Sequence, residues 1–75
     1  MSLYKKLIRD VLTKSGHAPT DADLVAVESL MRDQYGTLDH LSVATINREA
    51  RLCFAALELA DREDPELASS LRGGL

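Results

Sequence analysis

Residues 42–64, SVATINREARLCFAALELADRED, read as one long helix and decide the fold of this chain. At about 100° per residue, apolar side chains recur every three or four positions along one side of that helix. This first stripe consists of Val43, Ile46, Ala50, Cys53, Leu57 and Ala60. Leu52, Ala56 and Leu59 form a second stripe on a different side. One stripe can face the rest of a small protein, so the second needs either another helix of the same chain or a separate partner.

Two further helices are predicted on the N-terminal side of this stretch, from apolar periodicity and capping residues. A first apolar face predicts a helix over about residues 3–15, with Ser2 as its cap and Gly16 at its end. A second helix is expected over 21–35, because Thr20 and Asp23 have the spacing of a capping box.

On the C-terminal side, Asp64-Pro65 ends the long helix over 43–63 and begins a short one over 65–71. Leu67 and Leu71 are expected to pack this short helix against the core. Between the second and third helices, Leu38 and Leu41 predict a single helical turn. The sequence therefore predicts an all-α fold, a small three-helix bundle with a linking turn and a short C-terminal helix, in a single helical domain over residues 1–75.

Composition narrows the class of protein. The chain has 75 residues, a hydrophobic fraction of 45% and a net charge of −3, which indicates a folded protein and argues against nucleic-acid binding. Cys53 is the only cysteine, so an internal disulfide is excluded. No apolar run is long enough for a signal peptide or a membrane span, and a cytoplasmic location with no membrane partner is expected.

Charge is unevenly distributed along the chain. The first helix carries an excess of Lys and Arg, whereas the end of the long helix is rich in Asp and Glu. These are either two solvated faces or two regions that meet, within one chain or between two chains.

No catalytic or metal-binding motif stands out. Asp39-His40 is the one adjacent acid–imidazole pair, and it would need further ligands from His17 or Cys53 to hold a metal. Cys53 lies on the core stripe, where a thiol acts as a small apolar group. We therefore expect no enzyme activity, no metal and no cofactor.

The start of the long helix offers another interpretation. The run SVATINREARL, residues 42–52, resembles the start of a helix-turn-helix recognition helix, where a capping Ser leads into small polar residues and an Arg. The resemblance implies a dimeric DNA-binding regulator with DNA contacts from Ser42, Thr45, Asn47, Arg48 and Arg51. Here, however, the helix runs on to Asp64, about twice the usual length for that family.

The interpretation we favour is a small non-enzymatic interaction module or regulator. It would bind a protein partner, or a second copy as a homodimer, through the long third helix. The candidate contact residues are Leu52, Ala56 and Leu59, with Arg48 and Arg51 as a polar rim. Alanines at 55, 56 and 60 would let another helix approach closely. The alternative for the second stripe is cover by the first helix of the same chain.

Overall fold

The computed structural model describes residues 3–73. Its helices are α1 (Leu3–Lys14), α2 (Asp21–Tyr35), α3 (Val43–Glu63) and α4 (Pro65–Leu71), and these described residues include no strand. The expected all-α fold is confirmed, and each helix begins and ends within one residue of its predicted bounds. Ser2, the expected cap of α1, lies outside the described residues. None of the helices in this part of the chain is long and apolar enough to cross a membrane.

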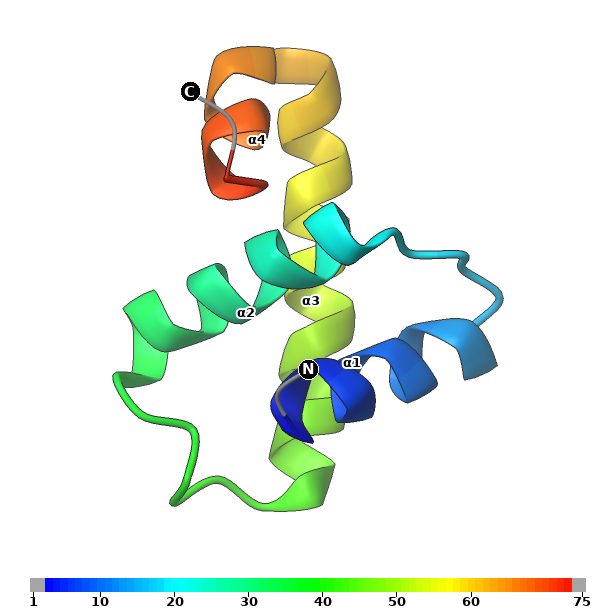
Figure 1. The fold of residues 1–75 in the computed structure, drawn as a ribbon, viewed down its shortest axis with the longest axis vertical. Coiled ribbons are helices and arrows are strands. Elements are labelled where there is room, and N and C mark those ends of the chain that lie inside the picture. The colour runs from blue at the N-terminus through cyan, green and yellow to red at the C-terminus, as the bar shows by residue number, and fades with distance from the viewer. Residues whose placement is uncertain (1–2, 74–75) are drawn as a thin grey trace.

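The three shorter helices are arranged around α3. Figure 1 shows α1 and α2 crossing α3 on the same side, while α4 folds back beside the C-terminal part of α3. The core lies between these helices, and Leu12, Leu24, Met31 and Leu57 within it are fully buried. Ile46, Ala50 and Cys53 of the predicted first stripe of α3 are also buried.

Local capping begins the helices where the sequence predicts. The Thr20 side chain accepts a hydrogen bond from the Asp23 N–H, and the Asp23 carboxylate accepts one from the Thr20 N–H, which completes a capping box at α2. Ser42 accepts from the Thr45 N–H at the start of α3, and Asp64 accepts from the Leu67 N–H at the start of α4. Gly36 ends α2 with a φ of 75°, in the left-handed region that favours glycine.

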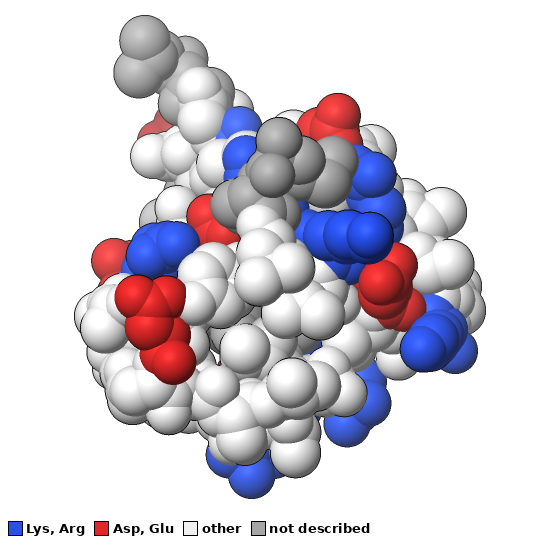
Figure 2. Space-filling model, turned by 60° about the horizontal axis from the view of Figure 1, so that its bottom comes forward, with Lys and Arg blue, Asp and Glu red and all other residues white. Residues whose placement is uncertain are grey.

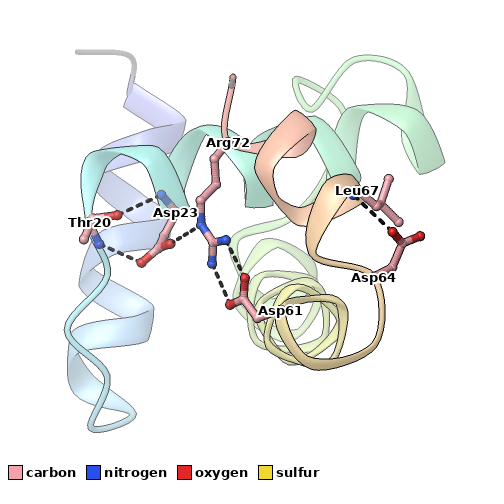
Figure 3. Close-up of polar contacts among 6 residues, drawn as sticks. All are labelled: Thr20, Asp23, Asp61, Asp64, Leu67 and Arg72. Carbon is pink, nitrogen blue, oxygen red and sulfur yellow. Dashed lines mark hydrogen bonds and ion pairs between the residues drawn. The ribbon is translucent and has the colours of Figure 1, made fainter. Parts of the chain in front are cut away.

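An ion-pair cluster holds the C-terminal end of α4 against α2 and α3. Arg72 donates from Nε to Asp23 at 2.8 Å and from both terminal nitrogens to Asp61 at 2.5 and 2.8 Å (Figure 3). Asp61, at the acidic end of α3, is therefore paired with Arg72 at the end of α4. Arg9 of the basic helix α1 instead pairs with Asp21 at the start of α2.

The single turn expected between the second and third helices is present at Leu38 and Leu41. This segment is an irregular connection with one isolated turn, closed by a 3.1 Å hydrogen bond from the Leu41 N–H to the Leu38 carbonyl. Residues 37–41 lie between Gly36, which ends α2, and Ser42, which caps α3, so the segment is too short to form more than one turn. Leu38 nevertheless fills the end of the core and is fully buried.

Two apolar residues lie outside the core although the pattern placed them in it. Val43 is 60% exposed, because it sits in the first turn of α3, at the edge of the area that α1 and α2 cover. Leu67 is 49% exposed, because α4 turns Ala68 toward the core instead. Leu71 is half-buried against the core, as expected.

Candidate protein-interaction face

One side of α3 carries no other helix of the chain. Since α1, α2 and α4 all pack on the side of Ile46 and Leu57, the opposite side is left to solvent (Figure 1). We call this side the outward face of α3 and define it by Arg48, Leu52, Ala55, Ala56 and Leu59, all exposed. Leu52 and Leu59 are 57% and 46% exposed.

The second stripe predicted from the sequence is thus exposed. Leu52, Ala56 and Leu59 lie together on the outward face, and the alternative that α1 covers them is wrong. The physical reason is the packing geometry: α1 and α2 both cross α3 on its core side, so α3 is the outermost layer. Among the described residues, no side chain shields these leucines from a partner of suitable shape.

A groove runs along the edge of the outward face, between α2 and α3. Its open volume is about 360 Å³, and its walls combine apolar and polar side chains. They are Leu30, Gln34, Glu49, Leu52, Cys53 and Ala56. Leu52 and Ala56 belong to both the groove and the outward face, so a bound surface could contact α3 and α2 together.

Glu49 is the buried carboxylate of this groove, and the apolar pattern did not single it out. It is 7% exposed, and it accepts a 2.7 Å hydrogen bond from the Tyr35 hydroxyl. The hydrogen bond to Glu49, together with partial burial, raises the pKa of Tyr35, so the phenol stays a donor at neutral pH. The spacing of fourteen residues between Tyr35 and Glu49 carries no sequence signal, because the contact joins two helices.

Arg48 is oriented by the same carboxylate. A terminal nitrogen of Arg48 lies 3.7 Å from Glu49 Oε1, and the Arg48 side chain is 62% exposed. A guanidinium has five N–H donors, so most of them remain available on the outward face. Arg48 therefore lies at the border of the apolar area, on the same side of α3 as Leu52.

Arg51 borders the outward face on the side of α1. With Asn47, it lines a groove of about 330 Å³ between α1 and α3, where Asp10, Lys14 and Val43 also contribute. The candidate DNA-contact residues are consequently divided between different sides of α3. Ser42 and Thr45 hydrogen-bond each other at the helix cap at 2.9 Å, and Arg48 points from the outward face.

Charge around the start of α3 is mixed. Figure 2 brings forward the end of the molecule that holds the 36–42 connection, and shows Lys and Arg interspersed with Asp and Glu around a broad uncharged area. The connection from α2 to α3 has seven residues, Gly36 to Ser42, whereas a helix-turn-helix uses three or four. Both features differ from those of a typical DNA-binding surface.

The Asp39-His40 pair lies on the surface. The Asp39 carboxylate accepts a hydrogen bond from the Tyr4 hydroxyl, and this bond lowers the pKa of Asp39. The Asp39 backbone N–H donates to the Thr37 hydroxyl oxygen at 3.3 Å. Both Asp39 and His40 are exposed. Within residues 3–73, no group of three or more His, Cys, Asp or Glu side chains is placed to hold a metal ion.

Cys53 lies at the boundary between core and groove. Burial raises the pKa of its thiol, and the nearby Glu49 carboxylate raises it further. A thiol with a raised pKa is a poor nucleophile at neutral pH, so the arrangement favours the packing role predicted for Cys53.

No family model, no curated protein and no solved structure matches this chain in the comparisons with known proteins.

Proposed function

We propose that this chain is a non-enzymatic helical interaction module that acts as a regulator by binding another protein chain through the outward face of α3. The observation that carries the proposal is the exposure of Leu52 and Leu59 on the longest helix, on the side away from the core. Single exposed leucines are ordinary on protein surfaces. Two of them two turns apart, with alanines between them and a groove alongside, are typical of an interface centre.

The composition of the face supports a helical or otherwise narrow partner surface. Ala55 and Ala56 have short side chains, so a second backbone can approach α3 closely between the two leucines. Arg48 supplies a polar border whose position is set by Glu49. A cytoplasmic setting, in which the single buried Cys53 stays reduced, belongs to the same proposal.

A photo-crosslinking experiment in the organism's own cells tests this function. A photoreactive residue such as p-benzoylphenylalanine replaces Leu59, and in a matched control it replaces Leu67, which is equally exposed but lies on α4. We expect discrete covalent adducts of identified composition from position 59 and none from position 67. An absence of adducts at position 59, in a variant whose circular dichroism matches the wild type, would contradict the proposal.

The DNA-binding alternative has one observation in its favour, because Asn47, Arg51 and Lys14 share the groove between α1 and α3. Binding to duplex DNA would weaken steeply with added salt and would be lost in the double variant Arg48→Ala and Arg51→Ala. A protein contact through Leu52 and Leu59 would resist salt and fail in Leu52→Asp. Electrophoretic mobility shifts of the purified chain at two salt concentrations separate the two functions.

A further inference from the structure

The order of residues along the outward face is that of a helix-pairing seam. Arg48, Leu52, Ala55, Leu59 and Arg62 follow one another at spacings of four and three, which keeps them on one line of an α-helix. All five are exposed. Arg51 and Glu58 border this seam on one side, and Ala56 and Glu63 border it on the other.

Charge along the seam changes sign from one end of α3 to the other. The N-terminal half of the seam and its borders carries Arg48 and Arg51, which outweigh the buried Glu49 beside Arg48, whereas the C-terminal half carries Glu58 and Glu63. Arg62 reduces the negative charge of the second half without cancelling it, since two carboxylates against one guanidinium leave −1. Ala55 and Ala56 lie at the midpoint, and Leu52 and Leu59 stand about one turn to either side.

We propose that the outward face of α3 pairs with the same face of a second copy of this chain, with the two α3 helices antiparallel. This inference rests on the proposed function, in that the face must be a protein contact, and it names the partner and the orientation. The twofold axis passes near Ala55 and Ala56, where the short side chains allow the closest approach of the two backbones.

In this register the two halves of the seam complement each other. Leu52 packs against Leu59 of the second copy, and Ala55 faces Ala56 of the second copy. On the border, Arg51 faces Glu58 of the second copy, and the guanidinium of Arg48 reaches Glu63 of the second copy. By the twofold symmetry each contact occurs twice.

Charge also selects the orientation. A parallel pair would set Arg48 of one copy against Arg48 of the other, and Glu58 of one copy against Glu63 of the other. Like charges facing each other are unfavourable, whereas the antiparallel arrangement brings opposite charges together. Glu63 makes no ion pair within residues 3–73, so its carboxylate is available to a second copy.

The contact uses one helix per copy, which places it below the roughly 1,200 Å² total of a standard interface. We therefore expect a reversible dimer with a Kd of about micromolar to hundreds of micromolar.

Light scattering on a size-exclusion column, over a range of protein concentrations, tests the dimer. We expect the average mass to rise from monomer toward dimer as concentration increases. Leu59→Asp should weaken self-association about tenfold or more, because it buries an unpaired carboxylate. Leu67→Asp, a change of the same kind on α4, should leave self-association unchanged. A monomeric mass at about 1 mM protein would overturn the inference.

Charge reversal and cross-linking test the orientation. Arg51→Glu alone and Glu58→Arg alone should each weaken the dimer, and the double variant should restore it. In a Cys53→Ser background, we expect Arg48→Cys in one copy to cross-link with Glu63→Cys in another, and Arg48→Cys not to cross-link with itself. Strong self-cross-linking of Arg48→Cys would show a parallel pair and contradict the inference.

The two proposals can fail separately. A monomeric purified protein whose position 59 still cross-links to a different, identified protein in cells would overturn the second copy as partner and leave the interaction face standing. No adduct at position 59 in either setting would overturn both.

Discussion

The Asp23 carboxylate takes part both in the capping box of α2 and in an ion pair with Arg72. One carboxylate oxygen accepts the Thr20 N–H at 2.9 Å, and the other accepts Arg72 Nε at 2.8 Å. Burial alone would raise the pKa of Asp23, but the hydrogen bonds from Thr20 and Arg72 outweigh it and hold the pKa below its ordinary value. The hydrogen bonds from Arg72 likewise lower the pKa of Asp61. Arg72 therefore holds the end of α4 through ion pairs with two ionised carboxylates, those of Asp23 and Asp61 (Figure 3).

This cluster predicts a loss of stability in acid. In the unfolded chain both carboxyls titrate near the ordinary value of 3.8, while in the folded chain they titrate lower. The unfolded state therefore binds protons first, and the stabilisation is present above about pH 4 and is lost as the pH falls through the folded pKa values. We expect the free energy of unfolding, measured with urea between about pH 6 and pH 3, to fall less steeply in Arg72→Gln than in the wild type.

The control for this experiment removes the same charge elsewhere. Lys6→Gln, on the exposed side of α1, should leave the slope of stability against pH at the wild-type value. Equal slopes in Arg72→Gln and the wild type would show that the cluster contributes nothing to the acid response.

At the scale of the element, helix ends were predictable because their determinants lie within three or four residues. Thr20 with Asp23, Ser42 with Thr45, and Asp64 with Leu67 are all contacts at a spacing of three. The side of a helix that faces the core was also predictable, since periodicity defines it.

Which residues of α3 the neighbouring helices cover was not predictable, because that depends on packing between elements. Val43 has the periodicity of a core residue and is exposed, while Glu49 is charged and buried beside Tyr35. The Phe54 ring packs against the His17 ring in a tilted arrangement with centroids 4.7 Å apart, a contact between residues far apart in sequence. For the candidate site, the sequence indicated Leu52, Ala56 and Leu59 but left open whether α1 covers them, and only the arrangement of helices answers that.

Helix α4 gives the clearest element-scale prediction. With seven residues it is too short to be stable alone, so its packing on α2 and α3 must hold it. Ala68 is 1% exposed at that contact. We expect Ala68→Leu to overpack the contact and to lower the free energy of unfolding by about 1–3 kcal/mol, measured by urea denaturation.

The adjacent Ser69 is exposed and provides the matched control. Ser69→Leu adds a side chain of the same size one position away and should change stability by less than about 0.5 kcal/mol. A loss in Ser69→Leu as large as that in Ala68→Leu would mean that α4 does not dock through Ala68.

At the scale of the whole molecule, α3 is a layer with a core on one side and solvent on the other. A chain of 75 residues buries only about 60% of its unfolded surface, so few core residues supply most of its stability. Leu57 is one of them and is fully buried, whereas Leu52, five positions earlier on the same helix, is 57% exposed. The two leucines therefore allow the same substitution to be compared on the two sides of α3.

We expect Leu57→Ala to lower the free energy of unfolding by about 2–5 kcal/mol, because it leaves a cavity in the core. Leu52→Ala should lower it by less than about 0.5 kcal/mol when unfolding is measured at protein concentrations too low for association. At high concentration Leu52→Ala should instead reduce self-association, since folding of the monomer and pairing of two monomers use opposite sides of α3. Similar losses from both substitutions at low concentration would mean that Leu52 is packed inside the monomer, and the outward face would then have no surface to offer a partner.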